Sequence, residues 1–201
     1  SPGCRRFGIL AGMPQTVTVI GAGLAGSEAA LQLADRGFAV RLVEARPLVP
    51  TPVHESANAA ELVCSNSLKG TRSDSAAGML KAELAALGSQ VYAAALRHAV
   101  PAGGALAVER AAFSADVTAL LEAHPRIRFE RAEVADVAEA AASADAVVVA
   151  AGPLATDALA ASLARLTGRD HLAFFDAAAP IVMADSLDRS KVFSQSRYED
   201  G

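Results

Sequence analysis

The feature that most constrains the fold is a glycine-rich turn, GAGLAG at residues 21–26, set between a strand pattern and a helix pattern. Residues 16–20 (TVTVI) are a short β-branched apolar run, typical of a strand buried on both faces. Residues 27–36 carry apolar side chains at helical spacing, and Gly37 is suited to end that helix. Residues 38–44 (FAVRLVE) then predict a second strand. This order forms a βαβ unit, whose two strands run parallel.

The turn matches the pattern G-x-G-x-x-G, which is typical of dinucleotide-binding sites. Its residues are Gly21, Ala22, Gly23, Leu24, Ala25 and Gly26. We expect Gly21 to permit the tight turn, Gly23 to leave room for a pyrophosphate, and Gly26 to let the helix pack closely on the strand. The N-terminus of the helix then faces the anion. The alternative is a glycine turn that holds no ligand.

An acidic residue follows at the expected distance. Glu44 ends the second strand 23 positions after Gly21 (44 − 21 = 23), close to the spacing of about 20 at which a carboxylate accepts hydrogen bonds from ribose hydroxyls. That carboxylate argues against a 2′-phosphate, and therefore against NADP. Arg46 could accept such a phosphate, but we favour a role in fixing the proline-containing loop of residues 45–55. The motif leaves FAD and NAD both open.

The remaining patterns predict an α/β protein with one main parallel sheet and a small appended lobe. Two helices are expected, at residues 73–87 with Met79, Leu80, Leu84 and Leu87 on one side, and at residues 110–123 with Phe113, Val117, Leu120 and Leu121 on one face. The other expected elements are a turn or loop at 99–110, one or two strands at 127–137, a central strand at 145–152 and a short helix at 159–166.

Composition excludes several classes of protein. The net charge of −4 offers no general attraction to nucleic acid or to an anionic membrane surface. No apolar run reaches the roughly 18 residues that a membrane helix needs. Two cysteines, Cys4 and Cys64, form no disulfide framework, so we expect reduced thiols and a cytoplasmic protein. We predict no metal site.

Several segments together resemble one family, the folate- and FAD-dependent tRNA uracil-5-methyltransferases (TrmFO), relatives of the GidA-type flavoproteins. The segments are VIGAGLAGSEAA, ELVCSNSLKG, VPAGGALAVER, AAGPLATDAL and FFDAAAPIV, in this order. The resemblance implies a Rossmann-like FAD/NAD(P)-binding fold that is incomplete at its C-terminus, because members are about twice this length. Because a strand pattern starts soon after Met13, we expect residues 1–12 to be an extension or leader. We expect an FAD-binding domain at 13–201, with the start of a substrate-facing region after about residue 155.

The resemblance also implies a reaction. FAD would bind at residues 21–26 with Glu44 on the ADP ribose, and methylenetetrahydrofolate would supply a one-carbon unit to uracil C5 in the tRNA T-loop. Reduced flavin would complete the methyl group, and NAD(P)H would recharge the flavin. Asn66 is a candidate for the flavin ring or for its own turn, and Gly152 for a close backbone approach to the dinucleotide. The alternatives are a GidA-related FAD/NAD oxidoreductase and an inactive dinucleotide-binding fragment.

Two interpretations of Cys64 stay open, with equal weight. Uracil C5 is a poor nucleophile until a group adds to C6, and a thiolate is well suited to that addition. A free cysteine can equally be an inert side chain packed beside the flavin.

Overall fold

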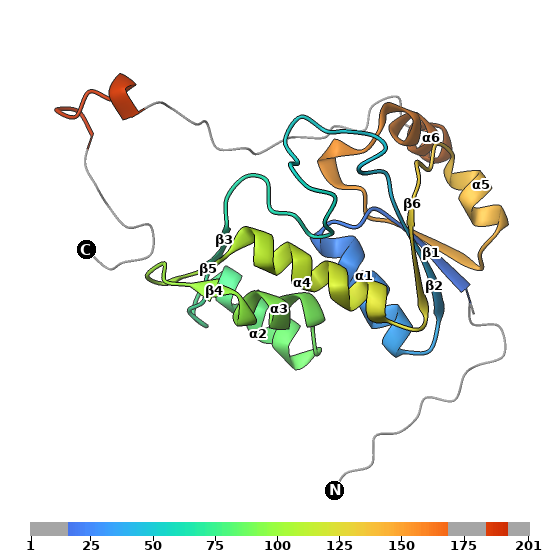
Figure 1. Cartoon of the computed structure of the whole chain (residues 1–201), viewed down its shortest axis with the longest axis horizontal. Coiled ribbons are helices and arrows are strands. Elements are labelled where there is room, and N and C mark those ends of the chain that lie inside the picture. Colours follow the sequence, from blue (N-terminus) through green and yellow to red (C-terminus); the bar gives the residue numbers. More distant parts are fainter. Residues whose placement is uncertain (1–15, 169–183, 193–201) are drawn as a thin grey trace, which may run out of the picture.

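The computed structural model describes residues 16–168 and 184–192, and its centre is a parallel sheet of four strands. The order across this sheet is β6-β2-β1-β7 (Figure 1). The strands are β1 (Thr16–Ile20), β2 (Ala39–Glu44), β6 (Ile127–Arg131) and β7 (Ala146–Val149). Helix α1 (Leu24–Asp35) connects β1 to β2, so the predicted βαβ unit is confirmed.

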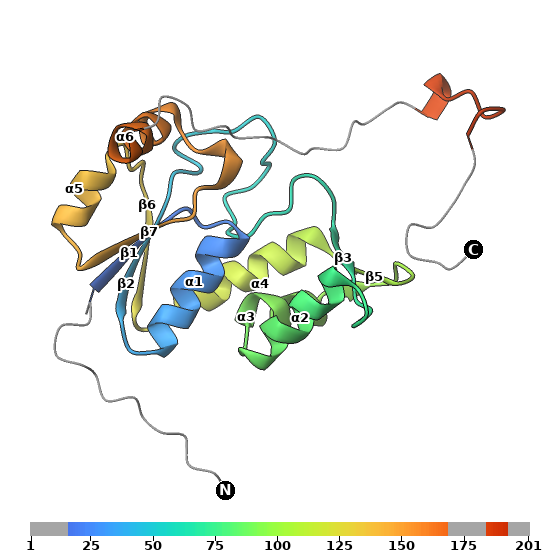
Figure 2. The ribbon, with the colours of Figure 1, turned by 180° about the vertical axis from the view of Figure 1, so that it is seen from behind.

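Helices cover both faces of this sheet. Helices α1 and α4 (Arg110–Ala123) lie on one face, whereas α5 (Val137–Ala142) and α6 (Asp157–Thr167) lie on the other (Figures 1 and 2). Strand β1 alternates between the two layers, because Val17 and Val19 join the core with α1 and α4 while Ile20 packs with α5 and α6. A strand buried on both faces was predicted from its continuous apolar run, and residues 17–20 are indeed buried.

A second, antiparallel sheet lies beside this core. Its strands are β3 (Ser67–Gly70), β4 (Ala99–Val100) and β5 (Ala105–Val108), in the order β3-β5-β4. The expectation of only a turn or loop at 99–110 was wrong, because β4 and β5 form a hairpin around the Pro-Ala-Gly-Gly turn. Gly103 provides the positive φ of 58° that this turn uses. Strands of two and four residues are too short to show a clear period.

Helices α2 (Ala76–Ala86) and α3 (Gln90–Arg97) complete this part of the chain. The helix predicted at 73–87 is present as α2, whereas α3 was not predicted. The apolar side expected for that helix is largely exposed, with Met79 at 57%, Leu80 at 55% and Leu87 at 68%. The helix packs instead through Gly78 and Lys81, which are buried.

The predicted helices at 110–123 and 159–166 are present as α4 and α6, and Phe113, Val117 and Leu121 of α4 are fully buried. The expected central strand at 145–152 is β7, which pairs only with β1 and is an edge strand among the described residues. Two short 3-10 turns are η1 (Gly152–Leu154) and η2 (Ala184–Ser186).

Some expectations fall outside these elements. The extension at 1–12 and Cys4 lie outside the described residues, and the boundary after about residue 155 stays a prediction. In the part of the chain that is described, no helix is both long and apolar enough to cross a membrane. That same part contains no group of three or more metal-ligating side chains.

Candidate dinucleotide-binding site

Two glycines of the GAGLAG turn are required by the packing around them. Gly21 has a φ of +98°, and a Cβ at this position would lie 2.7 Å from the carbonyl oxygen of Ala150 at the end of β7. A Cβ on Gly26 would lie 1.8 Å from the carbonyl oxygen of Gly21. Any side chain at Gly26 would therefore push α1 away from the turn, as the sequence predicted.

Gly23 differs from its neighbours because it faces open space. No heavy atom lies within 4 Å of the position that its Cβ would occupy. Gly23 is also the N-cap residue of α1, and no side chain caps this end of the helix. Leu24 and Ala25, the first two helical residues, are exposed. The positive end of the helix dipole thus points into an unfilled space, as an anion site requires.

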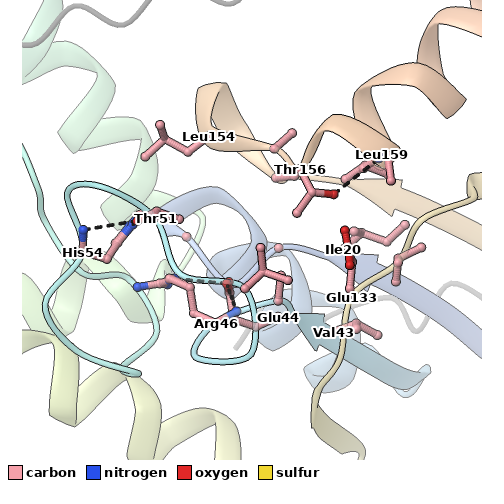
Figure 3. A pocket seen from close by; sticks show the side chains of 18 of the residues that line it. Ile20, Val43, Glu44, Arg46, Thr51, His54, Glu133, Leu154, Thr156 and Leu159 are labelled. Atoms are coloured by element: carbon pink, nitrogen blue, oxygen red, sulfur yellow. Dashed lines mark hydrogen bonds and ion pairs between the residues drawn. The ribbon is translucent and has the colours of Figure 1, made fainter.

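A cavity of about 750 Å³ opens beside this turn (Figure 3). Its lining comes from the ends of β1 and β2, from the loops that follow β2, β6 and β7, and from the start of α6. These are the carboxyl ends of the parallel strands, where open α/β sheets bind their ligands. Gly21, Gly23, Glu44 and Arg46 line the cavity, so the structure brings together these sequence-predicted residues.

Glu44 is almost fully buried, at 7% exposure, and both of its carboxylate oxygens are engaged. Its Oε2 accepts the N–H of Ala22 at 2.7 Å, and its Oε1 accepts the N–H of Arg46 at 3.0 Å. Burial alone would raise the pKa of Glu44, but the backbone N–H groups of Arg46 and Ala22 and the Arg46 guanidinium outweigh it and lower that pKa. Glu44 is therefore an anion that also holds the glycine turn.

Arg46 fixes the loop after β2, which agrees with the favoured reading of the sequence. The residue as a whole is only 5% exposed. Its Nε donates to Oε1 of Glu44 at 3.1 Å and its Nη1 donates to Oε2 of Glu61 at 3.3 Å. A guanidinium held between two carboxylates has little attraction left for a 2′-phosphate. Any direct contact of Arg46 with a cofactor stays a prediction.

The other predicted residues lie outside the lining of this cavity, namely Ala22, Leu24, Ala25 and Gly26 of the turn together with Cys64, Asn66 and Gly152. Cys64 is a free, exposed cysteine in the segment between β2 and β3. Asn66 donates its Nδ2 to the carbonyl oxygen of Val108 at 3.1 Å, which ties its segment to β5. Gly152, with a φ of +66°, opens the turn after β7. Their roles toward a cofactor or substrate stay predictions.

The loops after β6 and β7 contribute lining residues that the sequence did not single out. Glu133 and Thr156 face the cavity from these loops, and Thr156 caps the N-terminus of α6. His54, in the loop after β2, also lines it and pairs its Nδ1 with Thr51 Oγ1 at 2.6 Å. Burial and then the charge of Arg46 lower the pKa of His54. The sequence did not identify these residues because the order of strands in the sheet, which decides which loops meet at one edge, cannot be read from it.

The fold and this site define a dinucleotide-binding α/β domain, with a glycine turn at a helix N-terminus and a carboxylate at the end of the next strand. A comparison with protein families is consistent with that class. The family described as Glucose inhibited division protein A matches residues 16–201, and the chain belongs to this family.

Curated relatives are longer than this chain. It is 52% identical over 189 residues to methylenetetrahydrofolate--tRNA-(uracil-5-)-methyltransferase TrmFO of Bacillus licheniformis, covering 94% of this chain and 42% of the relative. The protein of the same name from Prochlorococcus marinus is 53% identical over 186 residues, covering 92% of this chain and 50% of the relative. The chain thus spans half or less of these relatives. A solved structure of an MHPCO mutant matches with a TM-score of only 0.34 and 17% identity, over 58% of this chain and 32% of that one.

Proposed function

We propose that the cavity binds FAD and that the protein forms 5-methyluridine in the T-loop of tRNA, with methylenetetrahydrofolate as the carbon donor. The observation that carries this proposal is the identity of 52% over 94% of the chain to a relative of that name. The matched stretch of 189 residues spans the glycine turn, Glu44 and the segment of Cys64. With this function we also propose NAD(P)H as the source of electrons and the cytoplasm as the location.

The cavity suits the ADP half of FAD. The pyrophosphate would lie against Gly23 and the N-terminus of α1, where a side chain is missing and the helix dipole is uncapped. Glu44 would accept a ribose hydroxyl, since it is held as a carboxylate at the end of β2. The same negative charge disfavours a nucleotide with a 2′-phosphate at this position. When bound, reduced FAD would supply the electrons that complete the methyl group.

Cys64 is proposed as the nucleophile that activates the uracil. Addition of its thiolate to C6 would move an electron pair to C5, which would bond to the methylene carbon as that carbon's bond to a folate nitrogen breaks. Loss of the C5 proton would then expel the thiolate from C6. The exposed position of Cys64 favours this reading over an inert, buried thiol. Asn66 would then serve mainly to hold the base of the Cys64 segment against β5.

The first test is a visible absorption spectrum of the purified 201-residue chain after incubation with FAD and desalting. Retained flavin bands are expected if the cavity is sufficient for binding. The second test measures transfer of labelled carbon from methylenetetrahydrofolate to tRNA by a version of the chain extended to the length of its relatives. NADH oxidation without tRNA methylation would instead favour a GidA-related oxidoreductase. A folded, colourless chain would indicate a fragment that cannot hold FAD alone.

A further inference from the structure

A buried ion-pair chain joins Glu44 to the segment that carries Cys64. Arg46 donates its Nε to Glu44 at 3.1 Å and its Nη1 to Glu61 at 3.3 Å. The exposed fractions of these side chains are only 10%, 6% and 9% for Glu44, Arg46 and Glu61. Glu61 lies three residues before Cys64 in the chain. The carboxylate at the dinucleotide site and the base of the cysteine segment thus share one arginine (Figure 3 shows Arg46 against Glu44).

Glu61 also closes the loop that follows β2. Its Oε1 accepts the N–H of Glu55 at 2.8 Å, and its Oε2 accepts the N–H of Ser56 at 3.1 Å and the Ser56 hydroxyl at 2.7 Å. With Arg46, four donors converge on this one carboxylate. Burial would raise the pKa of Glu61, but these backbone and hydroxyl hydrogen bonds lower it, so Glu61 stays charged.

The chain on either side of Cys64 is anchored. Before it, the N–H of Ala60 donates to the carbonyl oxygen of Ala22 in the glycine turn at 2.8 Å. The guanidinium of Arg110 donates to the carbonyl oxygen of Leu62. After it, Asn66 is bonded to β5. Cys64 therefore lies in a short exposed stretch whose base is attached directly to the glycine turn.

The hydrogen bonds that Glu44 already accepts decide whether a ribose bound to Glu44 would compete with Arg46. A carboxylate has about four lone-pair positions, and Glu44 uses three of them, on the N–H of Ala22 and on the N–H and Nε of Arg46. A ribose that donates one hydroxyl can use the remaining position on Oε2. A ribose that donates two must compete with Arg46. The position of Arg46 is thus linked to the state of the ribose site.

We propose that Arg46 and Glu61 are a positioning pair that holds the Cys64 loop in fixed register with the dinucleotide site. Occupation of Glu44 by a ribose that donates both hydroxyls then changes the freedom of the thiol loop, because that ribose competes with Arg46. This inference rests on the proposed function for the roles of Glu44 and Cys64. In this proposal Arg46 and Glu61 act by holding the loop and not on the reacting atoms themselves.

A nitroxide spin label on Cys64 tests the pair directly. Cys4→Ser leaves Cys64 as the only thiol for labelling. In the protein with the unmodified Arg46–Glu61 pair, the electron paramagnetic resonance spectrum of the label is expected to contain a slow-motion component. Glu61→Gln should lose this component, although the side chain keeps its size. Arg46→Lys should recover more of it than Arg46→Met, because an ammonium can still pair with one carboxylate. The matched control is Arg41→Met, which removes another arginine of the same region that pairs with Glu130 at 2.9 Å.

Addition of saturating FAD supplies the second readout. In the chain with the intact pair, FAD is expected to change the slow component, and in Glu61→Gln this response should vanish. An unchanged slow component in Glu61→Gln without FAD, with circular dichroism showing a folded chain, would overturn the proposal. Loss of the slow component in Arg41→Met to the same extent as in Glu61→Gln would also overturn it. Failure of the chain to retain FAD would count against the proposed cofactor site alone, since the comparison without FAD does not depend on it.

Discussion

Replacement of Gly23 by valine should separate cofactor binding from folding. The backbone at Gly23 has φ −69° and ψ −170°, an extended conformation that valine adopts readily. No atom lies within 4 Å of the new Cβ. The cost to folding is the poorer N-cap, about 1 kcal/mol, which corresponds to a fall in Tm of about 2–4 °C in a domain of this size.

The cost to binding should be much larger. The valine methyl groups would occupy the space of the pyrophosphate and block its approach to the N-terminus of α1. Loss of two hydrogen bonds to a charged group costs roughly 3–6 kcal/mol, or ~10²–10⁴-fold in the Kd of FAD. Fluorescence titration with FAD and a thermal melt followed by circular dichroism measure the two effects separately.

Gly26→Ala is the contrasting variant. Its Cβ would lie 1.8 Å from the carbonyl oxygen of Gly21, so the turn and α1 must separate and Tm should fall far more than in Gly23→Val. Wild-type affinity for FAD in a folded Gly23→Val protein would refute the assignment of Gly23 to the pyrophosphate. An unchanged Tm in Gly26→Ala would refute the packing argument.

Three further predictions concern other parts of the chain. Glu28 accepts the N–H of Val91 at 2.9 Å and the Ser89 hydroxyl at 2.7 Å, so Glu28→Ala should lose about 1–3 kcal/mol of stability in urea unfolding, and an unchanged midpoint would contradict this. Cys64→Ala in the extended version of the chain should abolish tRNA methylation but keep FAD, and retained activity would return Cys64 to a packing role. The pKa of Glu44 is lowered from 4.5, so its stabilisation is present above that pH and is lost as pH falls through the folded pKa. The stability of Glu44→Gln should therefore fall less steeply with decreasing pH than that of the wild type. An equal loss of stability at acid pH in the two proteins would exclude this contribution.

Local sequence patterns predicted the elements that position the site. The β-branched run of β1, the glycines of the turn and the helical spacing of α1 and α4 each specify backbone conformation within a few residues. Gly21 and Gly26 could be assigned because only glycine fits their places. The edge position of β7 was not predictable in this way, because an apolar run does not reveal how many strands will pair with it.

The short strands and the exposed side of α2 were harder to predict for a related reason. Strands β3, β4 and β5 are stabilised by their pairing with one another, and two to four residues carry no periodic signal. The exposure of Met79 and Leu80 likewise depends on which side of α2 meets the rest of the protein.

The sequence by itself determined the βαβ unit, the open N-terminus of α1 and a carboxylate at the end of β2, because these follow from steric rules and spacing along a single segment. The tertiary structure decided that Arg46 lies between Glu44 and Glu61, and that the loops after β6 and β7 share a cavity with the glycine turn. Such contacts depend on the order of strands in the sheet, which brings together residues far apart in the chain. The proposed cofactor position is thus encoded locally, whereas the proposed coupling of that position to Cys64 arises only on folding.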